Sequence, residues 1–389
     1  MNYKDILFNT LKSAEDNNFS GYSKFDALNS PLLNFMTLGN KWLTLGLTQL
    51  VKQSPFHIRP FLGVKKSRNP KGIALFVRSY LVLFEFTKDK IFLSKAIDLL
   101  DWLIKNSSPG EKHKCWGYNY IWQNTIFLQQ KNEPNAVVTT FVGEAFLEAY
   151  KITKNPSYLD ILNSISLFLC SRLPVLFEND KERAISYVCS SSDAIVLNVQ
   201  VITASLLIKI HSLTKKKSLR NNAIKQYNYT INKITDYHAW FYTYPSNKSP
   251  ITHDNYHTAF ILDAILEYFE ETGDDRFMNI YYNALGYYTK NLFLPTGAPK
   301  WMYNKNYPND IHGSASGIIT FSKASKYDAK YLTMAKKVLD WTIKNLYRDK
   351  NNDFIYRKGK YLYWNYSLMR WCNAWMCYAI SEFILLNKK

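Results

Sequence analysis

Apolar residues recur every three to four positions along most of the chain, which is the spacing of amphipathic helices. From about residue 73 these segments come in pairs, and each pair is joined by a short turn that carries Thr-Lys or a similar dipeptide. The turns start at Thr87, Thr153, Thr214, Thr272 and Ser325, with spacings of 66, 61, 58 and 53 residues. The pattern predicts five helical hairpins between residues 73 and 347.

Two of the predicted hairpins carry nearly the same sequence. Residues 100–106 read LDWLIKN and residues 339–345 read LDWTIKN, and such self-similarity is typical of a repeat architecture. The first helix of each pair is rich in small residues, as in Thr139–Ala145 and His312–Gly317. Because small residues allow close packing on several sides, we expect these to be inner helices and their partners to be outer ones.

Helices at both ends of the chain complete this architecture. Residues 365–386 form a sixth inner segment, and the segments around 5–14 and 32–52 also have helical spacing. We therefore predict an all-α fold, an (α/α)6 toroid that forms a single domain over residues 1–389, with N-terminal helices within about residues 1–60 closing the ring. An open solenoid is the alternative, but an array of this length without obvious polar caps favours closure.

The links from each outer helix to the next inner helix are long and rich in aromatic residues. They span about residues 107–138, 174–193, 236–255, 293–310 and 348–363. In a toroid all of them must emerge on one face, and long loops over a rigid scaffold are where binding and catalysis usually take place.

Charge and composition narrow the class of protein. Lys plus Arg number 49 against 31 Asp plus Glu, a net charge of +18 that suits an acidic glycan or an anionic membrane surface. No zinc-finger, P-loop or RNA-binding motif accompanies it, so no nucleic-acid partner is predicted. The chain has no run of 18 apolar residues, its start lacks a secretory signal, and its five cysteines form no C-x-x-C pair. We expect a cytoplasmic protein.

Acids and histidines recur where long loops meet the predicted inner helices. Asp254 precedes Tyr256 and His257, and Asp310 precedes His312. A carboxylate and an imidazole together can move protons near neutral pH, so these five are the candidate catalytic residues. Asp is also a preferred residue at helix N-termini, so each acid has a structural interpretation as a cap.

A second group of candidates could bind substrate. Aromatic rings offer an apolar face to the C–H side of a sugar, and amides offer hydrogen bonds. Packing of the toroid end is the structural alternative for each aromatic residue taken singly. The candidates are Trp116, Tyr118, Trp122, Asn135, Asn198, Trp301, Tyr303 and Trp364.

No metal or cofactor is predicted. Asp254, His257, Asp310 and His312 could in principle supply ligands, but the chain has neither an H-E-x-x-H motif nor a cysteine cluster. It also has no G-x-S-x-G, Walker or G-x-G-x-x-G motif, so nothing favours a serine hydrolase, an NTPase or a Rossmann oxidoreductase.

Four motifs carry a resemblance to a known family. In order, Cys115–Tyr118 with Trp122-Gln123, Pro134–Thr139, Asp254–Thr258 and Asp310–Ala315 resemble bacterial and archaeal proteins associated with surface-polysaccharide biosynthesis. The resemblance runs from about residue 69 to the C-terminus and implies a six-hairpin toroid. More distantly, Asp254–Thr258 is similar to a Tyr-His-Thr motif in the helical domain of glucuronyl C5-epimerases, whose β-domains are absent here. The toroid also resembles those of unsaturated-uronyl hydrolases and polysaccharide lyases.

These observations favour a carbohydrate-active enzyme that works on an acidic, uronate-containing glycan or its precursor. In epimerisation or lyase-type elimination, a base removes the C5 proton and an acid delivers a proton, while a cation steadies the enolate-like charge. Tyr256, His257 and His312 would carry protons, and a loop Arg or Lys would hold the carboxylate. A glycoside hydrolase with Asp254 and Asp310 as paired carboxylates is one alternative. A noncatalytic glycan-binding or assembly protein is another, and the oligomeric state stays open.

Overall fold

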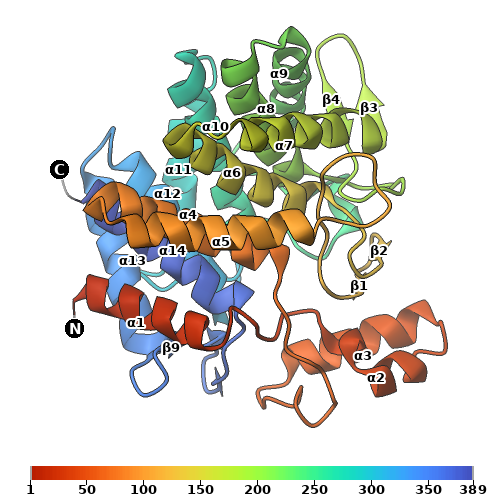
Figure 1. Cartoon of the computed structure of the whole chain (residues 1–389), viewed down its shortest axis with the longest axis vertical. Helices are drawn as coiled ribbons and strands as arrows, with labels where there is room; N and C mark the ends of the chain where they lie inside the picture. The colour runs from red at the N-terminus through yellow and green to blue at the C-terminus, as the bar shows by residue number, and fades with distance from the viewer. Residues whose placement is uncertain (1, 388–389) are drawn as a thin grey trace.

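Two concentric layers of helices make up most of the structure, a computed structural model that describes residues 2–387 (Figure 1). Each helix of the inner layer packs against the next one along the chain, and the last packs against the first, so the ring is closed. The inner helices are α4 (Pro70–Thr87), α6 (Ala136–Thr153), α8 (Leu197–Thr214), α10 (Asn255–Thr272), α12 (Ile311–Ala324) and α14 (Trp375–Leu386).

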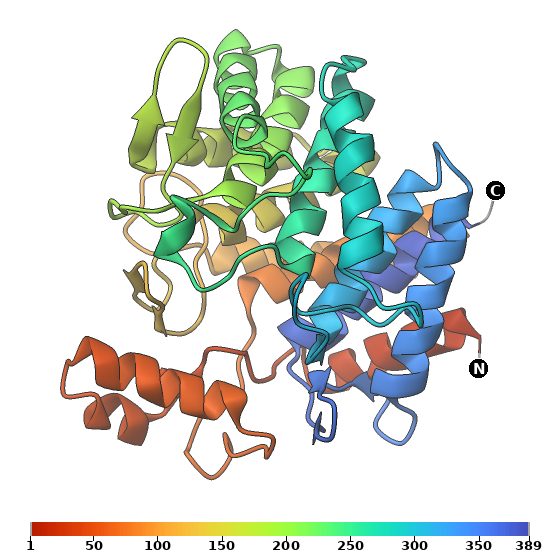
Figure 2. The same cartoon turned by 180° about the vertical axis from the view of Figure 1, so that it is seen from behind.

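Each inner helix has an outer partner that packs on its far side (Figure 2). Five of these partners follow their inner helix in the chain, whereas the partner of α14 is the first helix of the protein. The outer helices are α5 (Lys90–Lys105), α7 (Pro156–Leu167), α9 (Lys217–Ile231), α11 (Met278–Asn291), α13 (Lys330–Leu346) and α1 (Tyr3–Asp16). The predicted all-α toroid is confirmed.

The Thr-Lys turns have a common physical cause. The hydroxyl of Thr87 donates to the carbonyl of Leu83 inside α4 and accepts from the backbone N–H of Asp89. Lys88 between them is left-handed, with φ of 62°, which ends the helix. Asp89 then caps α5 by accepting from the N–H of Ile91. Three consecutive residues thus end one helix and start the next, and the turns after α6 and α10 use Thr in the same way.

Ion pairs link four inner helices at the centre of the ring. Lys209 of α8 lies 2.9 Å from Glu144 of α6 and 2.8 Å from Glu267 of α10. Glu267 also lies 2.6 Å from Lys323 of α12. All four side chains are at most 18% exposed. Because buried charges need partners, this network fixes the relative register of four helices.

Within residues 2–387, short strands occur only in the long links. Two of the small sheets join neighbouring links, β5 with β6 and β7 with β10, so the loops brace one another over the ring. The pairs are β1 (Trp122–Gln123) with β2 (Leu128–Gln129), β3 (Val175–Glu178) with β4 (Arg183–Ile185), β5 (Ile195–Val196) with β6 (Thr243–Tyr244), β8 (Tyr347–Arg348) with β9 (Asp353–Phe354), and β10 (Arg357–Lys358) between β7 (Asn309–Asp310) and β11 (Tyr363–Trp364).

The N-terminal region differs from the expectation in one respect. Helix α1 completes the outer ring, but α2 (Pro31–Met36) and α3 (Lys41–Gln53) project from the ring beside β1 (Figure 2). Gln53 joins them to the last long link, because its side chain accepts from Arg357 at 2.7 Å and its carbonyl from the indole N–H of Trp364 at 2.9 Å. The residues 32–52 therefore cover the loop face instead of closing the ring.

Among the described residues, one helix has the length and composition to cross a membrane. It is α8, and 72% of its 18 residues are buried inside the ring.

Candidate functional site

A cavity of about 100 Å³ lies at the loop-rich end of the ring. Its walls combine the first turns of inner helices with aromatic residues from the long links and from the N-terminal segment. The lining residues are Phe25, Lys71, Tyr118, Tyr120, Trp122, Val137, Tyr187, Asn198, Tyr242, Ile251, Tyr256, His257, Phe260, His312, Arg370 and Trp371.

His257 and Asp254 form a close pair in the first turn of α10. Nδ1 of His257 lies 2.8 Å from Oδ2 of Asp254, and the carboxylate is 1% exposed. Asp254 occupies the N-cap position, yet its side chain accepts no capping hydrogen bond. The carboxylate and the imidazole are thus in close contact, although Oδ2 and Nδ1 do not meet the geometry of a hydrogen bond, and a small rotation of the ring would let the acid orient it. The capping interpretation of Asp254 is not supported by this geometry.

His312 is a buried imidazole without a partner. Neither of its ring nitrogens has a hydrogen-bond partner within residues 2–387, although the side chain is only 2% exposed. Burial, together with the charges of Lys71 and Lys24, holds the pKa of His312 well below its usual value. A neutral imidazole facing a cavity can accept a proton or a hydrogen bond from a ligand.

Tyr256 lies between the two histidines. Its ring centroid is 4.3 Å from that of His257 and 4.4 Å from that of His312. Burial, with help from Asp254 and Asp310, raises the pKa of Tyr256 well above its usual value. The phenol therefore stays protonated and can serve as a hydrogen-bond donor or an acid.

Two buried cations face the same cavity. Lys71 lies in the first turn of α4, where its ammonium is 3.7 Å from the ring centroid of Phe141. Arg370 donates to the hydroxyl of Tyr120 at 3.1 Å, but its Nε is buried without a partner. Neither cation forms an ion pair with a carboxylate in the described part of the chain. Burial, followed by the charge of Arg370, lowers the pKa of Lys71 well below its usual value.

The sixth inner segment begins with a π-helical turn, Arg370–Ala374, directly before α14. Such turns interrupt the regular helix and are frequent at functional sites. This one carries both Arg370 and Trp371, which line the cavity.

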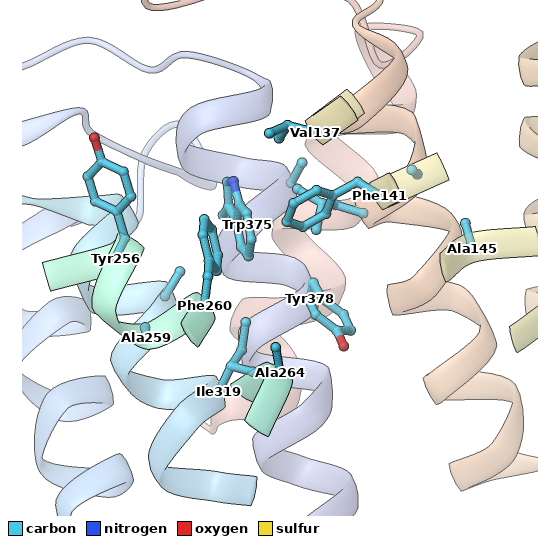
Figure 3. Packing of buried hydrophobic residues seen from close by; sticks show 14 of the residues in the cluster. Val137, Phe141, Ala145, Tyr256, Ala259, Phe260, Ala264, Ile319, Trp375 and Tyr378 are labelled. Carbon is cyan, nitrogen blue, oxygen red and sulfur yellow. The ribbon is translucent and has the colours of Figure 1, made fainter. Parts of the chain in front are cut away.

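Three aromatic rings form the floor beneath this site (Figure 3). Phe141, Phe260 and Trp375 meet with ring centroids 5.4 to 5.8 Å apart. Beyond them lies a second cavity of about 60 Å³, whose lining includes Glu144 and Glu267 of the central ion network. The floor separates the cationic cavity from the acids of that network.

Asp310 differs from the prediction. Its carboxylate caps α12 by accepting from the N–H of His312 at 3.0 Å, and it also accepts from the indole of Trp371 at 2.7 Å. Nζ of Lys24 lies 3.4 Å away. With these donors around it, Asp310 holds the wall of the cavity and does not line it.

Two predicted binding residues are structural. Trp116 is fully buried, and its indole N–H donates to the carbonyl of Leu103 at 2.9 Å. Asn135 caps α6 by accepting from the N–H of Val138 at 2.8 Å. Both anchor the first long link to the ring, which is why neither reaches the cavity.

Three further candidates lie outside the cavity wall. Trp301 packs near Tyr256, with ring centroids 6.4 Å apart. Tyr303 is 42% exposed in the fourth link. Trp364 donates to Gln53 and stacks under the guanidinium of Arg357 at 4.0 Å. The predicted residues that do meet at the cavity are Tyr118, Trp122, Asn198, Tyr256, His257 and His312.

Sequence analysis did not single out Lys71, Arg370 or Lys24. Lys71 and Arg370 each stand in the first turn of an otherwise apolar inner segment, and such an isolated charge is a signal that could have been used. Lys24 carries no such signal, because it comes from the N-terminal segment that folds back over the site. Tyr187 and Tyr242, which also line the cavity, lie in links already noted as aromatic.

Within residues 2–387, no three side chains of His, Cys, Asp or Glu come together in a way that could hold a metal ion. The polar atoms of the cavity are instead imidazoles, phenols, an amide and two cations. That set suits an organic anion with hydroxyl groups.

No protein-family model and no curated protein sequence matches the chain. Solved structures do match. Cellobiose 2-epimerase from Bacillus thermoamylovorans is 12% identical, with a TM-score of 0.63 over 82% of this chain and 90% of its own. The GH76 α-mannanase of Bacteroides thetaiotaomicron is 14% identical, with 0.62 over 83% and 87%. An unsaturated glucuronyl hydrolase specific for heparin is 13% identical, with 0.62 over 84% and 88%. At these identities the likeness shows that the chain shares their (α/α)6 toroid fold.

Proposed function

We propose that the protein is a carbohydrate-active enzyme that performs acid–base chemistry, of epimerase or lyase type, on a uronate-containing glycan or its precursor. The observation that carries this proposal is one cavity in which two histidines and a tyrosine face two buried cations that have no carboxylate partner. Sugar epimerases, a glucuronyl hydrolase and glycoside hydrolases share the fold, which supports carbohydrate as the substrate class. The link to surface-polysaccharide biosynthesis is part of the proposal and rests on the sequence motifs.

The cations favour an acidic sugar. Burying a charge without a partner costs several kcal/mol, so Arg370 and Lys71 would be stabilised by a substrate carboxylate. The lowered pKa of Lys71 fits this role, because a substrate anion beside the amine would favour its protonated form. Asn198, whose buried Oδ1 has no partner among the described residues, can accept from a sugar hydroxyl.

The proton carriers have distinct positions. His257, oriented by Asp254, would remove the C5 proton, and the electron pair would move toward the carboxylate held by Arg370. In epimerisation, Tyr256 would return a proton to the opposite face of C5, while neutral His312 would accept a hydrogen bond from the substrate. In elimination, Tyr256 would protonate the oxygen at C4, the C4–O bond would break and a C4=C5 double bond would form.

The structure offers little support for the hydrolase alternative, which requires Asp254 and Asp310 to act as paired carboxylates. Asp310 accepts from three donors and lies outside the cavity lining, so it is poorly placed to act with Asp254 on one glycosidic bond. A glycan-binding protein would need the same cavity but would have no use for a carboxylate that orients one imidazole. The geometry therefore favours proton transfer over both alternatives.

The test uses purified protein and soluble uronate-containing glycans in deuterated water. Deuterium at C5 of recovered glycan would support an epimerase, and an ultraviolet-absorbing unsaturated product would support a lyase. New reducing ends without absorbance would overturn the proposal in favour of a hydrolase. Binding without any chemical change in the glycan would overturn it in favour of a binding protein.

A further inference from the structure

The N-terminal projection carries an uncovered apolar surface. We call residues 31–63, which comprise α2, α3 and the loop that follows, the apolar hairpin. Six of its large apolar side chains are 59 to 90% exposed: Phe35, Leu38, Trp42, Leu50, Phe56 and Phe61. Soluble proteins rarely gather so many in one place unless something covers them.

Helix α3 is oriented with its apolar residues outward. Its buried positions are Thr44, Thr48 and Val51, whereas Trp42 and Leu50 face solvent. A surface helix that packs only on its own protein buries its apolar stripe and exposes its polar one. The reversed arrangement indicates that the outer face of α3 has an apolar partner outside this chain.

The charge around the hairpin identifies the partner's chemistry. No Asp or Glu occurs between Asp26 and Glu85. Over the same stretch, the exposed basic side chains are Lys41, at the start of α3, and Lys65 and Lys66, which closely follow the hairpin in the chain. An apolar surface whose own stretch of chain carries exposed lysines and no acid is complementary to an anionic lipid headgroup layer above acyl chains.

We propose that the apolar hairpin docks on the surface of an anionic lipid bilayer and lies within its interface. Helix α3 has 13 residues, which is too short to span the hydrocarbon core. A second copy of the chain fits less well, because pairing two hairpins would bring lysines of both copies together with no acid to compensate them.

Docking of the apolar hairpin would also bring the candidate site close to the membrane surface. Gln53 at the end of α3 is hydrogen-bonded to Arg357 and Trp364 of the last long link. Lys52 lies 5.5 Å from the ring of Phe25, which lines the cavity. The hairpin is therefore joined to the rim of the site. If the proposed function holds, membrane docking would favour glycans carried at a lipid surface.

Vesicle flotation tests the docking directly. The full-length protein is mixed with vesicles of phosphatidylcholine alone or of phosphatidylcholine with phosphatidylglycerol. We expect it to float with the mixed vesicles and to stay behind with the neutral ones. The double variant Phe35→Ser/Trp42→Ser should lose binding by about tenfold or more, because two large apolar side chains no longer enter the interface. The matched control is Ile91→Ser/Tyr282→Ser, on outer helices away from the hairpin, which should float like the wild type.

A second set of variants tests the role of charge and compares two triple Lys→Glu variants that have the same net charge. Lys41→Glu/Lys65→Glu/Lys66→Glu should abolish flotation, whereas Lys215→Glu/Lys216→Glu/Lys217→Glu, at the turn between α8 and α9, should keep most of it. All variants should retain the wild-type thermal midpoint, because the changed side chains are exposed.

Three outcomes would overturn the proposal. The wild type could remain unbound to the mixed vesicles, or the hairpin variants could float as well as it does. The wild type could also be a dimer that the double variant converts to a monomer, without lipid binding by either, which would assign the surface to a second copy. Turnover of a soluble glycan by the hairpin variants should equal that of the wild type, so this test succeeds or fails independently of the proposed activity.

Discussion

At the scale of the residue, Lys24 places a buried ammonium group of the N-terminal segment in the interior of the protein. Its ammonium is 2% exposed, lies 3.7 Å from the ring centroid of Trp371 and has Asp310 as its nearest carboxylate, 3.4 Å away. Burial lowers its pKa to about 7, and the charge of Asp310 opposes this only in part. The Lys24 side chain therefore connects the N-terminal segment to the cavity wall, and its charge changes with pH near neutrality.

We predict that Lys24→Met flattens the dependence of stability on pH. The unfolded chain holds a proton on Lys24 up to about pH 10, while the folded protein releases it near pH 7, so stability should rise with pH between these values. Thermal midpoints at about pH 6 and about pH 9 should differ more for the wild type than for the variant. Lys90→Met, at the exposed start of α5, is the control and should behave like the wild type. An equal rise in Lys24→Met would show that other groups cause it.

A second prediction concerns His257. His257→Gln preserves size and some hydrogen bonding but cannot carry a proton near neutral pH, so turnover of the glycan identified above should fall by about 10²-fold or more. Asp254→Asn should reduce turnover as well, because the negative charge 2.8 Å from Nδ1 of the imidazole is lost. Thermal midpoints should change little. Full turnover in His257→Gln, or outright unfolding, would assign this histidine a structural role.

Arg370 gives a test of the substrate's charge. Arg370→Gln should weaken the apparent affinity for a uronate glycan by about 10²-fold, the usual cost of removing one side of a buried charge pair. The same variant should bind a carboxyl-reduced form of that glycan about as well as the wild type does. Its thermal midpoint should not fall far, since the empty site gains nothing from an unpaired cation. Equal losses on both glycans would mean that Arg370 does not contact the carboxylate.

The candidate site was predictable only in part, and the reason is visible in single residues. Tyr256, His257 and His312 were found because the start of an inner helix points toward the loop face. Asn135 shares that position and Trp116 lies in the long link before it, but each satisfies a buried backbone group and so belongs to the scaffold. A motif gives the place of a residue along the helix. It does not say which neighbour its polar atoms will meet.

At the scale of the element, the hairpin turns were the most predictable feature. A Thr hydroxyl, a left-handed residue and a capping Asp or Asn are all local, so three residues of sequence are enough to define them. Helix α3 was the least predictable in its placement. Its apolar spacing is that of an inner or outer helix, but its threonines face the protein and its large apolar side chains face away. Periodicity indicates that a helix has two faces and leaves open which one the chain itself covers.

Two glycines on neighbouring helices make a matched test of inner-helix packing. A methyl group added to Gly317 of α12 would lie 2.5 Å from the ring of Phe293, whereas one added to Gly286 of α11 would meet nothing within 4 Å. Gly317→Ala should therefore destabilise the protein by about 1–3 kcal/mol. Gly286→Ala should stabilise it by about 0.5–1 kcal/mol, since alanine favours the helix. Urea unfolding measures both, and equal effects would show that α12 has room at this position.

At the scale of the whole molecule, the closed ring follows from six similar hairpins, and the repeat in the sequence was sufficient to predict it. The charged centre was not, because Glu144, Lys209, Glu267 and Lys323 lie on four different inner helices and look like isolated charges in the sequence. They become a network only when the ring brings the helices together. The same holds for the cavity, whose walls come from the N-terminal segment, the links and the inner helices.

Removing one member of that network should therefore affect the entire fold. Burial alone would raise the pKa of Glu267, but Lys209 and Lys323 hold it well below its usual value, so it is charged at neutral pH. Glu267→Gln leaves both lysines short of a partner and should cost about 3–5 kcal/mol of unfolding free energy. Glu270→Gln, one turn further along α10 and paired with Lys326 nearer the surface, should cost less than about 1 kcal/mol. Chemical denaturation of the two variants compares them, and similar losses would contradict a structural role for the centre.

The pairing of α1 with α14 has a consequence for synthesis. The sixth helix pair consists of α1 and α14, the first and the last helices of the described residues, so one member is synthesised long before the other. Until α14 has been synthesised, α4 and α12 each lack one neighbouring helix. The incomplete ring is then an open arc whose two ends expose apolar surface. Contacts between segments so distant in sequence form slowly. The growing chain should thus depend on chaperone protection until α14 has been synthesised, and truncation within α14 should be far more damaging than its twelve residues would indicate.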